Sequence, residues 1–584
     1  MGDAELVTQL RQAAVGRGDL VGLAVAPDGT AAVAVGGQPA GWVGAAGELG
    51  AADDEVRPRW VTWSQEDAQR LVAAGVRLAT CWDVAAVHRL LFGGWRADPG
   101  FAWAHLNRLP LDGVPAAGAS RVVGMADLFD AALEDEPAPV QAEADADVGP
   151  VGADGYLRVD WTRGGWAGSP ERLLAWAWLA TQAAELQRTA LEPGPAEART
   201  GATVRAESAA ELLCAELAVD GLPMDREAAE RVLAGFIGPR PRNPADAAAM
   251  RATRDQTVLR HAPAGVTADL RSPVQVRSLL AAAGFDVPDT RAWRLEEFKD
   301  ASPLIAALLE WRKAERIATT YGYGWLDEAL GPDGRLRGAW TASDGAAGRM
   351  TASNGLHNMP AAMRRAVIAA DGHLFVRADL GQIEPRVLAA VSGDAALAQA
   401  TQADDMYLPV AAELGVDRPT AKVAMIAAMY GQTTGHGGVA GRRMRTAYPV
   451  AMGYLDAADR AARAGRDLRT HGGRLVRMSA GSIASPARTA ARGRYGRNAL
   501  VQGAAAELFK MWAVTVRARG PALGARIVLC LHDELLVHVA EQHADAAAAL
   551  VGDCLAETAR RWAPRGDVRF IAETSVVRCW ADAK

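Results

Sequence analysis

Three short segments in fixed order constrain this chain more than any other feature of its sequence. Residues 374–379 (LFVRAD) are an apolar run that ends in Asp379, and residues 527–539 (IVLCLHDELLVHV) are two apolar runs separated by His-Asp-Glu. Between them, Arg418 and Lys422 are four residues apart, so on a helix their side chains lie one turn apart on one face. The pattern predicts two strands that each bring an aspartate to an exposed end, and a helix that presents two cations.

The residues around these segments indicate what the segments do. Asp379 is followed by Glu384-Pro385, and because proline is tolerated in the first helical turn, a strand-to-helix switch is expected there. Asp533 and Glu534 fall at the tip of a predicted hairpin, where clustered carboxylates repel each other unless a cation intervenes. Two metal-binding aspartates with fixed positive charge for a polyphosphate are what in-line transfer onto a nucleoside triphosphate requires. Taken alone, Asp379 would be interpreted as a turn or cap residue.

The composition is typical of a large globular chain of several domains. Half of its 584 residues are hydrophobic and 23% are charged. We find no apolar run of membrane-spanning length and no signal-peptide pattern, so no membrane association and a cytoplasmic, nucleoid-associated location are expected. The five cysteines show no CxxC spacing, which argues against a zinc site and a disulfide framework.

Basic residues are concentrated in one part of the chain. The net charge is −6, yet residues 442–497 contain thirteen arginines against three aspartates. Such clustering favours binding to a phosphate backbone, because each neutralised phosphate releases counterions. A solvated arginine-rich surface is the alternative, and charge alone does not decide between them. Lysine is rare, with five residues in the whole chain, which makes Lys422 conspicuous.

The alternation of short strands and helices predicts an α/β multidomain protein. Strands are expected at residues 20–25, 31–35, 59–63 and 76–81, with helices at residues 65–73 and 84–91. Residues 134–150 are acidic and rich in Pro and Ala, which is typical of a flexible loop. Mostly helical structure is expected from about residue 170 to 330.

The three segments resemble motifs A, B and C of the family A DNA polymerases, the family of bacterial DNA polymerase I. Motif A corresponds to residues 379–386 (DLGQIEPR), motif B to residues 418–431 and motif C to residues 532–534. Residues 348–360 look like the family's segment before motif A, and residues 494–505 look like its segment before the motif C hairpin.

The resemblance implies DNA-templated addition of dNTPs to a primer 3′ end, in repair or gap-filling synthesis. It implies an RNase H-like exonuclease-type domain at 1–195 and a right-hand polymerase domain, with a thumb at 196–330, palm at 331–400 and 501–584, and fingers at 401–500. The implied partners are primer-template DNA and dNTPs, and a monomer is expected.

The resemblance also implies roles for individual residues. Asp379 and Asp533 would ligate two Mg²⁺ ions, for which Mn²⁺ may substitute, with Glu534 in support and Lys422 as a proton donor to pyrophosphate. The implied nucleotide-binding residues are Arg418, Lys422, Tyr430, Gln382, Glu384, Ile426 and Tyr407, and Glu384 would reject a 2′-hydroxyl. The implied DNA-binding residues are Arg349, Asn358, Arg494, Asn498, Gln502 and His532.

Several positions depart from the family pattern. The usual Tyr-Ser after the motif A aspartate is Leu380-Gly381, the usual Leu before the motif A arginine is Pro385, and the usual aromatic residue of motif B is Ile426. Losing that aromatic removes a surface on which a base can stack, which affects nucleotide discrimination more than activity itself.

The N-terminal region lacks the carboxylates of a proofreading exonuclease, which uses four of them and two metals. Residues 3–5 (DAE) and 53–55 (DDE) match its first motif as strings but lie outside apolar runs. Asp83 could correspond to the second motif, although the usual asparagine partner is Ala79, and residues 169–178 lack the expected tyrosine and aspartate. We therefore predict a structural relic without 3′-to-5′ proofreading. Nothing resembles a 5′-nuclease domain.

Two alternative functions remain open from the sequence. A single-subunit phage-type RNA polymerase would share the metal aspartates and the Arg/Lys helix, but Glu384 and Glu534 argue against it. A catalytically silent DNA-binding clamp would keep the arginines of residues 442–497 without needing Asp379, Asp533 and Lys422 together.

Overall fold

A computed structural model describes residues 2–35, 41–114, 149–191, 195–431, 436–478 and 485–583. The acidic segment expected at residues 134–150 lies almost entirely outside these ranges. The chain divides into two compact units. Unit 1 consists of Met1–Gly221, Ala339–Ser353 and Gly372–Val577, and unit 2 of Leu222–Gly338, Asn354–Asp371 and Arg578–Lys584.

Unit 1 begins with a mixed five-stranded sheet in the order β3-β2-β1-β4-β5. The strands are β1 (Leu20–Val25), β2 (Thr30–Ala34), β3 (Gly41–Ala45), β4 (Arg59–Thr62) and β5 (Cys81–Asp83). β4 runs parallel to β1 and β5, whereas β2 is antiparallel to its two neighbours. This arrangement confirms the α/β character expected for this region.

The strand expected at residues 76–81 is wrong, because β5 starts only at Cys81. The backbone groups of the residues just before Cys81 form hydrogen bonds with side chains and not with a neighbouring strand. The amide nitrogen of Ala79 donates to Asp53 Oδ2 at 2.8 Å, and Arg517 donates to the carbonyl oxygen of Leu78 at 2.6 Å. The apolar residues Val76 and Leu78 are buried, so the hydrophobic pattern was real but did not form a strand.

Helices surround this sheet. They are α1 (Gly2–Gln12), α2 (Leu49–Glu55), α3 (Gln65–Ala73), α4 (Val84–Phe92), α5 (Pro99–Leu106), α6 (Val159–Thr162), α7 (Pro170–Thr189) and α8 (Pro195–Asp220). Helix α7 crosses β1 so closely that a Cβ atom at Gly22 would lie 2.1 Å from the carbonyl oxygen of Ala177. Only a glycine permits this approach of helix and strand backbones.

Helix α8 is attached to the rest of unit 1 by a buried ion-pair network. Glu207 pairs with Arg474 at 2.6 Å and with Lys510, and all three side chains are almost fully buried. Burial alone would raise the pKa of Glu207, but these two cations lower it. The network fastens α8 to the long helix α21 (Pro486–Arg519), so residues 195–220 belong to unit 1.

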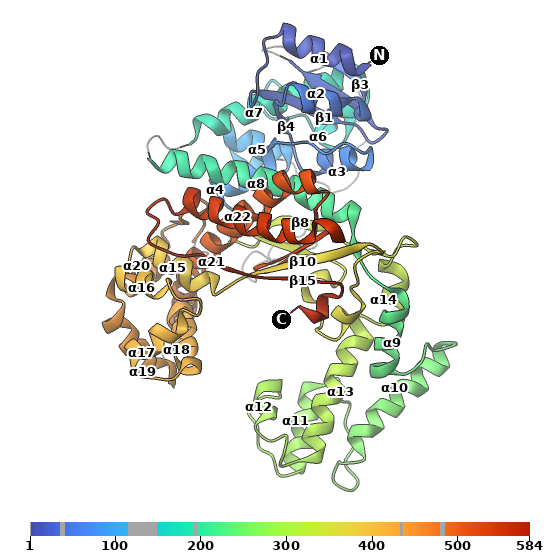
Figure 1. Ribbon diagram of the computed structural model, residues 1–584, viewed down its shortest axis with the longest axis vertical. Helices are drawn as coiled ribbons and strands as arrows, with labels where there is room; N and C mark the ends of the chain where they lie inside the picture. The colour runs from blue at the N-terminus through green and yellow to red at the C-terminus, as the bar shows by residue number, and fades with distance from the viewer. Residues whose placement is uncertain are drawn as a thin grey trace. The chain divides into compact units, whose positions relative to one another are not determined.

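The second sheet of unit 1 is antiparallel, in the order β13-β14-β10-β15. Its strands are β10 (His373–Leu380), β13 (Arg526–Leu531), β14 (Glu534–Ala540) and β15 (Ala572–Val577), and helix α22 (Ala544–Trp562) lies along it (Figure 1). The hairpin expected at residues 527–539 is present. β10 continues through Asp379 to Leu380, one residue beyond the expected end, because Leu380 still pairs with Ala572 of β15.

A group of helices follows β10 and shares one hydrophobic core (Figure 1). They are α15 (Ile383–Ser392), α16 (Ala395–Ala400), α17 (Tyr407–Leu414), α18 (Arg418–Tyr430), α19 (His436–Ala447) and α20 (Pro449–Arg463). Two short hairpins complete unit 1, formed by β8 (Trp340–Asp344) with β9 (Arg349–Ala352) and by β11 (Leu468–Arg469) with β12 (Leu475–Val476).

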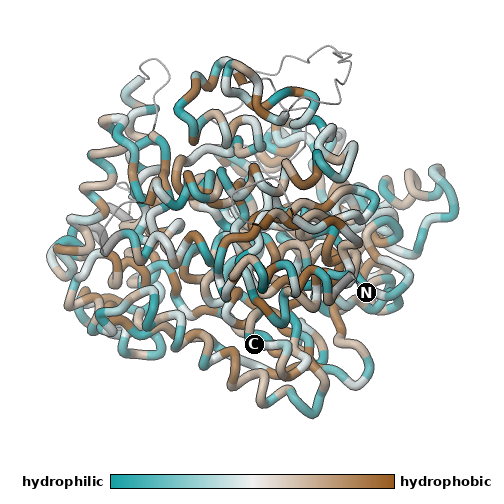
Figure 2. Tube along the Cα trace, turned by 90° about the horizontal axis from the view of Figure 1, so that it is seen from above, coloured by the Kyte–Doolittle hydropathy of each residue, from teal (hydrophilic) through white to brown (hydrophobic). Residues whose placement is uncertain are grey.

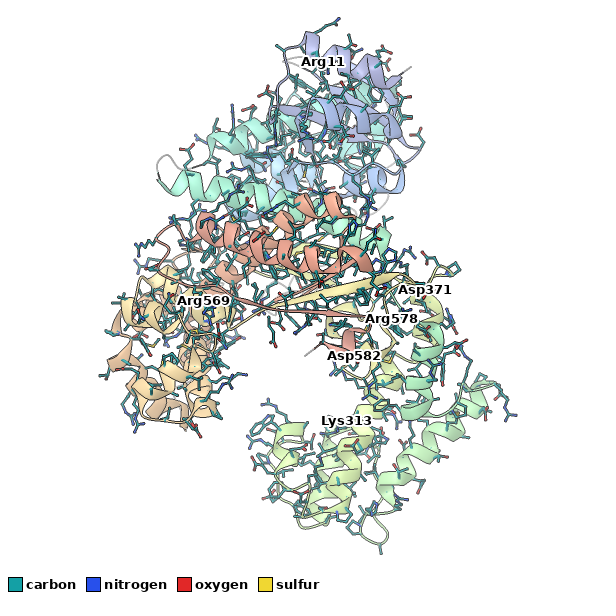
Figure 3. The ribbon with its side chains drawn as sticks, in the orientation of Figure 1. Arg11, Lys313, Asp371, Arg569, Arg578 and Asp582 are labelled. Carbon is teal, nitrogen blue, oxygen red and sulfur yellow. The ribbon has the colours of Figure 1, made fainter. Side chains whose placement is uncertain are left out.

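Unit 2 is mostly helical, as expected from its sequence. It contains β6 (Leu222–Pro223), α9 (Arg226–Ile237), α10 (Pro244–Leu259), α11 (Pro273–Ala282), α12 (Ala292–Glu296), α13 (Pro303–Thr320), α14 (Tyr323–Ala329) and β7 (Arg335–Leu336). The last residues of the chain return to this unit, where Arg578 pairs with Asp371 at 2.8 Å (Figure 3).

Figure 2 shows hydrophilic and hydrophobic residues interspersed along the chain trace. Across the described ranges, no helix has both the length and the apolar character needed to cross a membrane.

Candidate active site

The end of the second sheet carries acidic residues on adjacent strands. Asp379 of β10 is directly opposite Glu534 of β14 and Glu573 of β15. Residues that are opposite each other in an antiparallel sheet point to the same face, so the three carboxylates form one row. The amide nitrogen of Leu380 donates to the carbonyl oxygen of Asp533 at 3.0 Å, which fixes the hairpin tip beside the end of β10.

The hairpin tip is a two-residue turn formed by His532 and Asp533. The φ angle of His532 is +53°, a left-handed conformation that is uncommon outside glycine. Tight hairpin turns require positive φ, and a non-glycine residue held there stores strain of the kind found at functional sites. The pKa of Asp533 is raised to about 7, mainly by burial and also by the neighbouring charges of Glu384 and Asp379, while Arg349 opposes the shift.

The residues at this tip fit a divalent cation. Asp533 is held close to two other carboxylates, and a cation between them would remove the repulsion that raises its pKa. Carboxylate oxygens are the ligands that Mg²⁺ prefers. Within the described residues no group of three or more His, Cys, Asp or Glu side chains is arranged to hold a metal. A cation at Asp379 and Asp533 would therefore complete its shell with water or nucleotide oxygens.

Arg377 lies next to the acidic row, on the same face of β10 as Asp379. Its Nη2 atom donates to Asp379 Oδ2 at 2.5 Å and to Glu534 Oε2 at 3.1 Å. Burial by itself would lower the pKa of Arg377, but its hydrogen bond to Glu534 and the charges of Glu534, Asp379 and Glu573 raise it. The sequence interpretation missed this residue, although its position two residues before Asp379 places it on the same face of the strand.

Glu384 lies in the first turn of α15 and pairs with Arg349 of β9. Arg349 Nη2 is 2.8 Å from Glu384 Oε1, and the glutamate side chain is 17% exposed. Burial raises the pKa of Glu384, which the nearby arginine partly offsets. The structure therefore brings Arg349, Glu384, Asp379 and Asp533 together, as their expected roles require.

Arg386 anchors α15 below this site. Its buried guanidinium donates to backbone carbonyl oxygens at 2.5–3.0 Å, those of Gly381, Thr401, Ala403, Asp404 and Arg569. Arg569, labelled in Figure 3, also pairs with Asp404 at 2.8 Å. Burial lowers the pKa of Arg386 to about 10, with a contribution from Arg569. One side chain thus joins the motif A turn to two other chain segments.

The start of α18 carries the first expected phosphate ligand. Asp417 caps the helix, and Arg418 pairs with Asp405. The guanidinium of Arg418 also lies 5.7 Å from the ring centroid of Tyr407. Asp405 accepts hydrogen bonds from Gln382 Nε2 at 3.3 Å and from the Tyr407 amide at 3.0 Å. Asp405, which the sequence interpretation missed, thus links the motif A turn to this helix.

Lys422 lies one turn further along α18 and is exposed. In the part of the chain that the structure describes, it forms no hydrogen bond or ion pair. Ile426 follows at the next turn and is partly buried against the core of the helical group. The aliphatic residue therefore packs inward, where an aromatic ring would have offered a flat surface.

The remaining expected contacts gather where α18 ends against α21. Gln502 Nε2 donates to the hydroxyl of Tyr430 at 3.1 Å. Arg494, Asn498 and Gln502 are spaced by four residues, so they share one face of α21. Arg494 is exposed, whereas Asn498 Oδ1 is buried and has no hydrogen-bond partner among the described residues.

Many arginines of the basic segment form hydrogen bonds or ion pairs within the fold. Arg497, for example, donates to the carbonyl oxygen of Ala428 at 2.9 Å and pairs with Asp456 at 2.7 Å. Other arginines of the segment are also bonded within unit 1: Arg443, Arg445, Arg463, Arg469, Arg474, Arg477 and Arg492. Contacts within the fold therefore involve many of these arginines, while Arg443, Arg445, Arg463, Arg469 and Arg477 remain exposed.

Asn358 is separated from the other expected DNA ligands by the division into units. It is an exposed residue of unit 2, where its carbonyl oxygen accepts a hydrogen bond from Arg316 at 3.2 Å.

The N-terminal sheet offers one strand carboxylate among the described residues, Asp83 at the end of β5. Its Oδ1 atom caps α4 by accepting from the amide of Ala86 at 2.8 Å. Burial raises the pKa of Asp83, with a further contribution from Glu211, which itself pairs with Arg89 at 2.8 Å. Asp53 lies in α2 and accepts from the indole of Trp60, so it is also used structurally.

Tryptophans fill the space between this sheet and α7. The rings of Trp63 and Trp176 are 4.9 Å apart, and Trp166 stacks on Trp176 with centroids 6.0 Å apart. Trp63 Nε1 also donates to the carbonyl oxygen of Trp176 at 3.1 Å. Trp63 and Trp176 are almost completely buried, so hydrophobic packing occupies this side of the sheet.

Comparison with known proteins gives consistent matches. A family model described as DNA polymerase family A matches residues 248–582. The chain is 32% identical over 298 residues to DNA polymerase I of Chloroflexus aurantiacus, a match that covers 46% of this chain and 31% of that protein. It is 30% identical over 321 residues to the thermostable DNA polymerase I of Thermus filiformis, covering 50% and 38%. The matches thus span about a third of the relatives' own length.

A solved structure resembles the whole chain. It is the POL domain of Pol1 from M. smegmatis in complex with DNA primer-template and dNTP, with a TM-score of 0.69 and 18% identity. The match covers 99% of this chain and 98% of that one. At this identity the likeness shows the fold alone, an α/β polymerase fold.

Proposed function

The chain belongs to DNA polymerase family A, and we propose that it adds dNTPs to a primer 3′ end on a DNA template. The single observation that carries the proposal is the acidic end of the second sheet, where Asp379 and Asp533 lie beside the ion pair of Arg349 and Glu384. Phosphoryl transfer depends on positioned carboxylates and cations of this kind.

Asp379 and Asp533 would hold the metal cofactor, two Mg²⁺ ions or Mn²⁺ in their place. When bound, the cations would neutralise charge at the polyphosphate and acidify the primer 3′-hydroxyl. Asp379 is 38% exposed and so remains accessible to a cation, whereas Glu534 is largely buried and supports the site from below. The strained turn at His532 presents Asp533 to the same end of the sheet, and we assign the histidine to a contact with the primer terminus.

The triphosphate binds at the start of α18. Arg418 and Lys422 lie one turn apart, and the positive end of the helix dipole adds to their attraction for phosphate. Gln382 and the amide of Tyr407 hold the carboxylate of Asp405 by hydrogen bonds. Asp405 in turn holds Arg418 by an ion pair until the nucleotide binds. Lys422 carries no competing ion pair within the described ranges, which leaves its ammonium group available to protonate the departing pyrophosphate.

Glu384 rejects ribonucleotides and Ile426 contacts the incoming base. The ion pair with Arg349 holds the Glu384 carboxylate in one position, which supports this role. Ile426 provides an apolar contact without aromatic stacking, so base selection relies more on the template and on Tyr430.

The template and primer are contacted by the face of α21 that carries Arg494, Asn498 and Gln502, together with Arg349. Asn358, in unit 2, is assigned a separate contact with DNA. Among the described residues the buried Oδ1 of Asn498 has no hydrogen-bond partner, and this supports its assignment, because such an atom costs free energy unless a ligand satisfies it. These contacts recognise the shape and backbone of DNA, as a copying enzyme requires.

The N-terminal domain is a structural relic that does not proofread. Among the described strand residues of the N-terminal sheet, Asp83 is the one carboxylate, and a single capped carboxylate cannot hold two metals; tryptophans also pack between the sheet and α7. In the polymerase domain we assign residues 196–330 to the thumb, residues 401–500 to the fingers, and residues 331–400 and 501–584 to the palm. We assign its task to repair or gap-filling synthesis.

Primer extension with the full chain tests this proposal. A 5′-labelled primer-template is incubated with Mg²⁺ and each dNTP or rNTP in turn, and also without nucleotide. The proposal predicts addition of the complementary dNTP, poor addition of the rNTP and no shortening of the primer. Addition of ribonucleotides instead would favour an RNA polymerase, shortening would contradict the relic, and DNA binding without any addition would favour a clamp.

A further inference from the structure

Three carboxylates meet in one row at the end of the second sheet, and Arg377 lies next to them. Glu534, Asp379 and Glu573 are opposite one another across the neighbouring strands β14, β10 and β15, of which β10 and β15 are labelled side by side in Figure 1. Like charges directly opposite each other in a sheet destabilise it. A row of three therefore needs a positive charge close by when no metal is bound.

Arg377 supplies that charge from within the protein. It precedes Asp379 by two residues on the central strand, so its side chain lies on the same face. It bonds to both Asp379 and Glu534, at 2.5 and 3.1 Å. The arginine is 12% exposed and Glu534 is 8% exposed, and ion pairs are strengthened by such burial.

The two carboxylates that Arg377 binds differ in access. Asp379 is 38% exposed, so a cation can reach it from solvent, whereas Glu534 is enclosed. The Oδ2 atom of Asp379 cannot accept a full hydrogen bond from the guanidinium and ligate a metal ion at the same time. A dication at Asp379 would also lie close to the positive charge of Arg377 and be repelled by it.

We infer that Arg377 is a positioning residue that acts as the resident counter-cation of this row. In the metal-free protein it holds Asp379 and Glu534 in place, and it lowers the affinity of Asp379 for a divalent cation. Once a cation binds, Arg377 stays with Glu534 and keeps that buried carboxylate neutralised. The inference rests on the proposed metal-binding role of Asp379.

Equilibrium binding of Mn²⁺ to the full chain tests this role. Free Mn²⁺ is measured by electron paramagnetic resonance during titration of the native protein and of Arg377→Gln, Arg377→Met, Arg377→Lys and Asp379→Asn. The matched control is Arg526→Gln, because Arg526 lies in the same sheet, is 53% exposed and is 3.9 Å from Asp220. Removing the charge at residue 377 is expected to tighten Mn²⁺ binding roughly tenfold, while the lysine variant and the control remain close to native.

Thermal unfolding of the same variants gives a second readout. Without metal, Arg377→Gln should unfold at a lower temperature than the native protein, and saturating Mn²⁺ should raise its midpoint by more than it raises the native midpoint. The methionine variant keeps the apolar stem of the side chain. If the glutamine variant does not fold, the Mn²⁺ affinity of the methionine variant shows whether the charge at residue 377 weakens metal binding.

The outcomes separate this inference from the proposed function. If Asp379→Asn weakens Mn²⁺ binding but the neutral variants bind no more tightly than the native protein, Arg377 is not a competing counter-cation and the inference is overturned. If no variant shows binding that depends on Asp379, the proposed metal site fails, and the inference fails with it.

Discussion

Replacing Asp533 with asparagine should stabilise the metal-free protein at alkaline pH. The pKa of Asp533 is raised from 3.8 to about 7, first by burial and then by Glu384 and Asp379. Between pH 3.8, the ordinary pKa, and about pH 7, the pKa in the folded state, the folded state keeps a proton that the unfolded state has released. The free energy of unfolding therefore falls as pH rises. The asparagine variant has no charge to bury and avoids this loss.

The size of the effect follows from the shift. A difference of about 3 pKa units corresponds to about 4 kcal/mol at 1.36 kcal/mol per unit, which is an upper bound. Asp533 lies at a partly exposed turn, where water reduces the penalty, and we expect about half of that value. The variant should gain nothing below pH 4 and reach its full gain, about 2 kcal/mol, above pH 7.

Thermal unfolding in EDTA between pH 4 and pH 9 measures this gain. The matched control is Asp553→Asn, which removes an exposed carboxylate from α22 in the same unit. The midpoint of Asp533→Asn should rise above that of the native protein by a few degrees, only at the higher pH values. An equal difference at all pH values, or none beyond the control, would refute the account of how this carboxylate is placed.

Three further predictions concern neighbouring residues. Glu384→Ala should lower the preference for dNTP over rNTP at least about tenfold, measured by single-nucleotide incorporation, with Glu384→Asp retaining most of the preference. Lys422→Ala should reduce kcat for incorporation by roughly 10²–10³-fold, and Lys422→Arg by less, while primer-template affinity is unchanged. Arg386→Met should destabilise the protein by about 3–5 kcal/mol in urea unfolding, because it leaves buried carbonyl oxygens without donors; a loss under 1 kcal/mol would contradict the anchoring role.

The strands and the helix that form the site were predictable because in each of them an apolar run lies next to the residues expected to carry the chemistry. β10, the hairpin at residues 526–540 and α18 each follow from an apolar run next to a proline or a charged tip. The family resemblance is confirmed by the match over residues 248–582. The roles given to the individual site residues remain predictions.

What the sequence did not reveal depends on contacts between distant segments. Arg377 matters because β14 lies beside β10 in one register, and Asp405 matters because its loop folds back onto Gln382. The strand expected at residues 76–81 failed because side chains of Asp53 and Arg517 took over the backbone hydrogen bonds. A hydrophobic pattern reports burial, but it does not say which partner satisfies the backbone.

The most direct test of the proposed polymerase site compares the native protein with Asp379→Asn in two measurements. Primer-template affinity is measured by fluorescence anisotropy, and incorporation of one complementary dNTP is then followed in single turnover with Mg²⁺. The account predicts unchanged DNA affinity and a loss of at least about 10³-fold in incorporation rate, with Asp553→Asn equal to the native protein. Incorporation by Asp379→Asn at a rate near native would contradict it.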